Sequence, residues 1–161
     1  KKKFIVGFTF FLSIIAGLIA AILKDKKNGN LYKLSEFERF PIDIIQKVIS
    51  TEKDEIEKHI KLLLNGTLSD YKSIGLLHIG KFDFGILDLY TNILKNNLNK
   101  KELINSADIL KMENCETILL IAQMGNINRD QLELILEQIK LQKTKLSGII
   151  IISPNLKNEF Y

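Results

Sequence analysis

The sequence predicts an α/β domain with a parallel β-sheet, preceded by a transmembrane helix. Two wholly apolar runs, residues 117–122 and 148–152, have the composition of strands that are covered on both faces. An amphipathic helix is predicted between them, and strands separated by helices of this length form right-handed βαβ units. Farther towards the N-terminus, residues 4–23 form a run of twenty residues without a charged side chain.

The overall composition narrows the class of protein. Of the 161 residues, 46% are hydrophobic and 26% are charged, so the chain can form one folded domain and is not disordered. A single cysteine excludes a disulfide framework and a zinc site built from several cysteines. The formal net charge is only +4, and nearly all the cations are lysines. No arginine-rich surface for nucleic acid is predicted, so no nucleic-acid partner is expected.

The apolar run over residues 4–23 is interpreted as a transmembrane helix. At ~1.5 Å per residue it is about 30 Å long, which is the thickness of the hydrocarbon core of a bilayer. A secretory signal peptide is the alternative, but its apolar region is only ~7–15 residues long and precedes a small-residue cleavage site. Here the run ends in the charged sequence Lys24-Asp25-Lys26-Lys27.

Two sets of residues are predicted to act at the bilayer. Ser13, Gly17 and Ala21 are small residues four apart, a spacing that lets helices pack closely in lipid and favours a homo-oligomer. The alternative is that such residues are simply common in membrane helices. Lys24, Lys26 and Lys27 follow the apolar run directly and are expected to contact anionic lipid headgroups.

Residues 24–70 are interpreted as a juxtamembrane linker with short helices. A capping box over residues 35–38 begins a helix, which ends before Pro41. Residues 42–49 are apolar and β-branched and predict a strand. A helix with an apolar stripe follows over about residues 51–66 and ends at a C-cap glycine.

Residues 71–155 are interpreted as the α/β domain, and residues 156–161 as a tail. The predicted strands are 73–79, 101–104, 117–122 and 148–152, and the predicted helices are 83–96, 106–112 and 128–143. Because the runs at 117–122 and 148–152 are apolar throughout, we expect them to be neighbouring, parallel central strands.

A partial phosphate-binding pattern occurs at Gly75, Gly80 and Lys81. It matches the G-x-x-x-x-G-K part of a P-loop, whose glycines and lysine hold phosphates and whose next residue, Ser or Thr, binds Mg²⁺. Phe82 occupies that last position, and neither apolar strand ends in an aspartate that could hold the metal. The loop is therefore interpreted as degenerate, and no catalytic residue, cofactor or metal is predicted.

Three further side chains are interpreted as structural. Cys115 lies beside the acidic residues Glu113 and Glu116, which disfavour a reactive thiolate. His59 adjoins an apolar helical stripe, and His78 falls within a predicted strand. Neither histidine has a nucleophile or a second base at a spacing that indicates catalysis.

The order of segments resembles that of a bacterial protein family. The stretch Leu23 to Glu38 combines a charged exit from a membrane helix, a glycine turn and a short helix. It is similar to the end of chain-length determinant proteins, which are also called polysaccharide co-polymerases. Residues 106–155 resemble the last strand–helix–strand unit of the tyrosine kinase-like cytoplasmic domain that some members carry, a P-loop α/β fold. Gly80 and Lys81 fall where that family's phosphate-binding loop would lie.

The resemblance implies a membrane-anchored, non-catalytic component of chain-length control and export of O-antigen, capsule or exopolysaccharide. It implies the inner (plasma) membrane, a cytoplasmic C-terminal domain, a homo-oligomer, and contacts with the polymerase and export machinery. A periplasmic part would precede Lys1. One alternative is an active ATP-binding tyrosine autokinase of the same pathway. Another is a single-pass anchor that carries a small protein-binding domain.

Overall fold

The structure is a computed structural model that describes residues 2–27, 29–48, 52–82, 84–98, 100–142 and 144–153. The chain forms two compact units. The first unit ends at Asn30, and the second unit begins at Leu31.

The first unit consists of helix α1 (Lys2–Lys27). Among the residues that the structure describes, no helix combines the length and the apolar character needed to cross a membrane. The predicted transmembrane helix is therefore wrong, and so is the inner-membrane localisation that was inferred with it.

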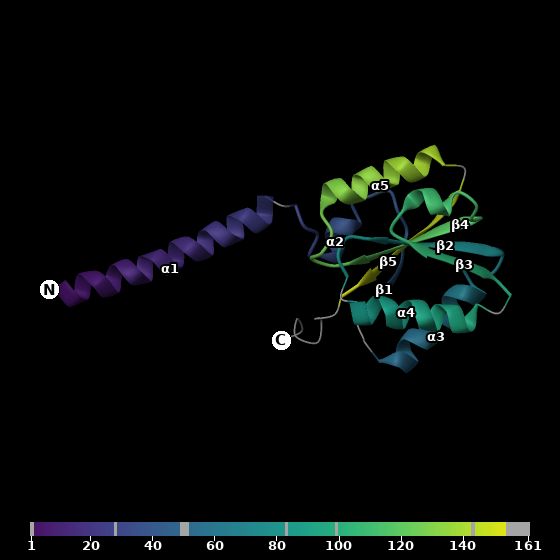
Figure 1. Ribbon diagram of the computed structural model, residues 1–161, viewed down its shortest axis with the longest axis horizontal. Coiled ribbons are helices and arrows are strands. Elements are labelled where there is room, and N and C mark those ends of the chain that lie inside the picture. Colours follow the sequence, from purple (N-terminus) through teal and green to yellow (C-terminus); the bar gives the residue numbers. More distant parts are fainter. Residues whose placement is uncertain are drawn as a thin grey trace. The chain divides into compact units, whose positions relative to one another are not determined.

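The second unit contains a five-stranded parallel sheet (Figure 1), with the strand order β1-β5-β4-β2-β3. The strands are β1 (Ile44–Val48), β2 (Ser73–Ile79), β3 (Glu102–Ser106), β4 (Thr117–Gln123) and β5 (Lys145–Ile152). The prediction that residues 117–122 and 148–152 form neighbouring parallel strands is confirmed, since Leu120 pairs with Ile149 and Ile121 with Ile150.

Helices cover both faces of this sheet. They are α2 (Leu34–Phe37), α3 (Lys53–Asn65), α4 (Phe84–Asn97), the 3₁₀ helix η1 (Ile109–Met112) and α5 (Arg129–Leu141). Helices α3 and α4 lie on one face, and α5 lies on the other (Figure 1). Alternate residues of β4 therefore enter two separate cores: Leu119 and Ile121 on the side of α3 and α4, Ile118 and Leu120 on the side of α5. This two-sided burial is why the strand is apolar throughout.

Helix α2 begins with a local cap that differs from the predicted one. The Glu36 carboxylate, not Glu38, accepts the backbone N–H groups of Tyr32 and Lys33, at 2.7 and 2.9 Å. The hydrogen bond from Lys33 is the main reason why the pKa of Glu36 is lowered from its ordinary value. The cap turns the chain so that Phe37 enters the core on the side of α5.

Part of the segment interpreted as a linker lies in this sheet and its core. Strand β1 pairs with β5, and Ile56 and Ile60 of α3 are buried against the same core as β2 and β4. The second unit therefore draws one of its two edge strands, β1, from residues before 70.

Strand β1 carries a β-bulge. Its register against β5 shifts between Ile44 and Gln46. Ile44 packs in the core on the side of α5, whereas Ile45 packs in the core on the side of α3. Gly148 of β5 lies beneath the bulge, where an added Cβ would be 2.6 Å from Ile45 Cγ1. The bulge positions the pocket described below.

Candidate functional site

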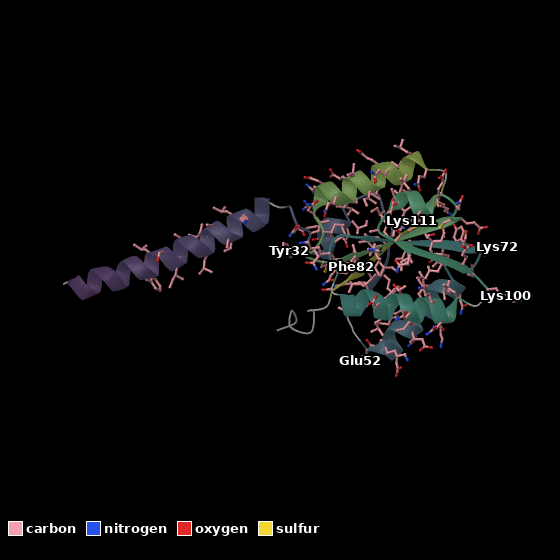
Figure 2. The ribbon with its side chains drawn as sticks, in the orientation of Figure 1. Tyr32, Glu52, Lys72, Phe82, Lys100 and Lys111 are labelled. Carbon is pink, nitrogen blue, oxygen red and sulfur yellow. The ribbon has the colours of Figure 1, made fainter. Side chains whose placement is uncertain are left out.

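The carboxyl end of the sheet between β2 and β4 is the first place to seek a site. The chain passes from β2 to β3 on one side and returns to β4 on the other, so the strand order reverses here. Open α/β sheets bind ligands outside the carboxyl ends of strands at such a switch point. Phe82 lies at this end, and Lys72 and Lys100 lie at the opposite end (Figure 2).

The loops that follow β2 and β4 contact each other at the switch point. The Lys81 backbone N–H donates to the Asn126 carbonyl, with 3.3 Å between nitrogen and oxygen. Gly80 has φ 84°, and an added Cβ there would be 2.5 Å from the same carbonyl oxygen. The backbone donor at Lys81, which a phosphate-binding loop would offer to its ligand, is therefore engaged with the protein itself.

The other glycine of the partial phosphate pattern lies within a strand. Gly75 is in the middle of β2 and pairs with Ile104 on one side and Ile118 on the other. A Cβ at Gly75 would lie 2.5 Å from Met112 Sδ, so the glycine makes room for the 3₁₀ helix above it. Phosphate loops instead turn successive N–H groups towards the anion. Gly75, Gly80 and Lys81 thus form a strand and a turn rather than an anion cradle.

A small polar cluster lies beside this end of β2 and β3. His78 Nδ1 is 3.3 Å from Asn105 Oδ1, and Asn105 Nδ2 donates to Thr91 Oγ1 at 3.4 Å. The ring of Phe82 meets the His78 ring edge-on, with 6.1 Å between centroids. An amide partner orients an imidazole but, unlike a carboxylate, does not stabilise the imidazolium that a general base must form. These contacts assign His78 a packing role.

Cys115 lies in the core on the side of α5. Burial raises the pKa of its thiol, and the nearby charge of Glu102 on β3 raises it further. From the sequence, Glu113 and Glu116 were expected to disfavour the thiolate. In the structure, the raised pKa of Cys115 comes instead from burial and from Glu102 on the adjacent strand β3. A thiol in this environment is both protonated and hard to reach.

We expect Cys115 to resist Ellman's reagent in the folded protein at pH 8. The expected rate is at least 100-fold below that of the same chain in urea, because modification requires the core to open. The measurement is the release of thionitrobenzoate over time. Modification at the unfolded rate in the native protein would contradict the burial of this thiol.

Acidic and metal-ligating side chains do not gather in the described part of the chain. There, no group of three or more His, Cys, Asp or Glu side chains is placed to hold a metal ion. On α1, Ser13, Gly17 and Ala21 are exposed, and a Cβ at Gly17 would meet no atom within 4 Å. Lys24 is exposed, whereas the side chains of residues 26 and 27 lie outside the described residues. Both predicted roles presuppose a membrane-spanning helix and lose their basis with it.

Sequence reasoning did not identify a pocket of about 410 Å³ beside the edge strand β1. Ile45, Gln46 and Lys47 of β1 form one wall. The other wall consists of His59, Leu62 and Leu63 of α3 together with Thr67. Its volume falls within the range of about 300–1,000 Å³ that is typical of ligand pockets. The polar Gln46 between the apolar residues Ile45 and Val48 of β1, next to Lys47, was the available signal in the sequence.

Gln46 is the most constrained polar group of this pocket. The buried Tyr90 hydroxyl donates to Gln46 Oε1 at 3.4 Å, and burial raises the pKa of Tyr90, which keeps it a donor. Gln46 Nε2 is also buried, and it has no hydrogen-bond partner among the described residues. A buried amide that lacks an acceptor costs about 1–3 kcal/mol, so a ligand that supplies one would bind favourably.

Comparisons of the chain with protein families, with curated proteins and with solved structures give no match. The chain's own residues therefore carry the functional argument: a parallel α/β sheet, a switch point closed by backbone contacts, and a pocket with an unpaired amide.

Proposed function

We propose that the second unit is a non-catalytic component of polysaccharide chain-length control, which acts by contacting proteins of the polymerisation and export machinery. One observation carries the non-catalytic part of this proposal. At the switch point, where this class of fold binds its ligands, the Lys81 N–H is bonded to Asn126, and Gly75 is held within β2.

The pathway in this proposal comes from the resemblance of residues 106–155 to the kinase-like domain of chain-length determinants. The arrangement of these residues supports it. Strand β4, helix α5 and strand β5 form one parallel βαβ unit, and Asn128 begins α5 by accepting the Gln131 backbone N–H at 2.8 Å. This is the buried strand, polar helix start and second strand that the resemblance implies.

The function test compares polymer length between cells that produce the full chain and cells that produce a truncated chain without residues 31–153. We expect the truncated chain to broaden or shift the length distribution on a polysaccharide gel while polymer is still made. Lys81→Ala in the full chain should leave the distribution unchanged, because no nucleotide step is assigned to that lysine. An unchanged ladder after truncation would contradict the role in length control.

A binding experiment distinguishes this proposal from the alternative of an active kinase. Titration of the purified full chain with Mg²⁺ and ATP in a calorimeter is expected to give no measurable binding heat at millimolar nucleotide. Lys140→Ala on α5 removes the same charge elsewhere and serves as the control for Lys81→Ala. A micromolar Kd that is lost in Lys81→Ala alone would overturn the non-catalytic assignment.

A further inference from the structure

We propose that the pocket between β1 and α3 binds an acidic side chain of an extended peptide, whose backbone pairs with the exposed edge of β1. The proposal deepens the proposed function, on which it rests, because it names the surface and the chemistry of a protein partner.

The pocket lacks a hydrogen-bond acceptor for the side-chain amide of Gln46. Gln46 Nε2 is buried without a partner in the described structure, while Oε1 of the same side chain already accepts from Tyr90. An Nε2 group can only donate, so its missing partner is an acceptor, and a carboxylate is the strongest acceptor that a protein side chain offers.

The bulge explains why this amide is aimed at the pocket. In a regular strand, Ile45 and Gln46 would point to opposite faces of the sheet. The register shift between Ile44 and Gln46 instead places Ile45 in the core beneath α3, on the same side as Tyr90, the partner of Gln46. Bulges at sheet edges redirect single side chains, often beside functional sites.

The lining of the pocket is compatible with an acidic occupant. His59 of α3 lines the pocket and can donate to a carboxylate, and none of the described residues that line the pocket is acidic. Leu62, of which 64% is exposed, offers an apolar surface for the stem of the entering side chain. A glutamate, with its two-carbon stem and terminal carboxylate, suits both parts of this lining.

The sheet edge favours a peptide over a small carboxylate. Among the described strands, β1 pairs with β5 alone, so one side of β1 keeps its backbone N–H and C=O groups available. Three consecutive residues of that strand line the pocket, so an occupant lies along the strand. An extended peptide can add to such an edge through main-chain hydrogen bonds and place one side chain in the adjoining pocket.

The test uses two displayed libraries of nine-residue peptides that differ only at the central position, which is glutamate in one and lysine in the other. The bait is the purified full chain. We expect the glutamate library to yield binders and the lysine library to yield none above background. Equal enrichment from both libraries would overturn the proposal.

The best glutamate peptide is then titrated against variants by fluorescence anisotropy. Gln46→Leu is expected to weaken binding about tenfold or more, because it removes a donor to a charged acceptor. Gln142→Leu is the matched control, since Gln142 Oε1 is the other buried, unpartnered amide atom in the described residues and lies outside the pocket. Unchanged binding to Gln46→Leu would overturn the assignment of the pocket.

A second pair of variants keeps the test decisive if Gln46→Leu alters the fold. Leu62→Glu puts a carboxylate in the pocket and should weaken binding about tenfold, whereas Leu134→Glu, at an exposed leucine of α5, changes the net charge equally and should have no effect. N-methylation of the peptide backbone beside the glutamate should also cost about tenfold. Full affinity after N-methylation would show that a carboxylate alone suffices and would contradict pairing with β1.

These outcomes are independent of polymer length. Peptide binding that fails while truncation of residues 31–153 still shifts the polymer ladder would remove this proposal and leave the proposed function. The reverse result would keep the peptide site and remove the pathway.

Discussion

Gly148→Ala is expected to destabilise the second unit by about 2–5 kcal/mol, the largest effect of any single methyl group that the structure indicates. Gly148 has φ 144°, a conformation that side chains with a Cβ avoid at a cost of about 1–2 kcal/mol. Its added Cβ would also lie 2.5 Å from the Asp43 carbonyl oxygen. Overpacking of this kind typically costs a further ~1–3 kcal/mol.

The measurement is the midpoint and slope of urea unfolding. Gly85→Ala is the control, because a Cβ at Gly85 meets no atom within 4 Å and the residue lies in helix α4. That change should leave the stability within about 0.5 kcal/mol of the wild type, because Gly85 is exposed in the first turn of α4. An unchanged urea midpoint in Gly148→Ala would contradict the close pairing of β1 with β5 at this residue.

Gly80→Ala is expected to cost about 2–4 kcal/mol and to separate the loops that follow β2 and β4. Gly80 adopts φ 84°, and its added Cβ would be 2.5 Å from the Asn126 carbonyl oxygen. A backbone atom cannot rotate away as a side chain can, so the loops must move apart. The hydrogen bond from Lys81 N–H to Asn126 is then lost or lengthened.

Comparison with Gly125→Ala separates the two causes of the instability expected for Gly80→Ala, which are the positive φ and the contact with a backbone oxygen. Gly125 has a similar φ of 79°, but its added Cβ would meet only the Tyr32 side chain, at 3.0 Å. We expect its loss of stability to be about half that of Gly80→Ala, because the tyrosine ring can give way. Amide hydrogen exchange at Lys81 provides the local measurement. Unchanged protection at Lys81 in Gly80→Ala would contradict the closed switch point.

Much of the sheet was predictable because its pattern is local. Ser73 to Ile79 was expected as a strand and is β2, and the runs at 117–122 and 148–152 lie in β4 and β5. Their apolar character follows from burial against two cores, a signal that each strand carries in its own residues. The same reliance on local apolar character produced the wrong prediction of a membrane helix at residues 4–23, since length and composition were the only criteria.

The candidate sites were less predictable because they depend on contacts between distant residues. The spacing of Gly75, Gly80 and Lys81 matches a phosphate-binding pattern, but the spacing does not reveal that Gly75 lies between β3 and β4. Gln46 owes its position to a bulge and to Tyr90, which is 44 residues away in the sequence. No periodicity within residues 42–49 encodes either fact.

The pairing of β1 with β5 also constrains how the protein is made. Ile44 pairs with Ile149, so β1 and the strand that it pairs with are separated by about a hundred residues in the sequence. A ribosome releases β1 well before β5 exists, and in that interval an apolar segment has no sheet to join. Closure of so long a loop slows folding and prolongs the exposure of an unpaired strand. Newly synthesised chains are therefore most vulnerable to aggregation just before residues 145–152 emerge.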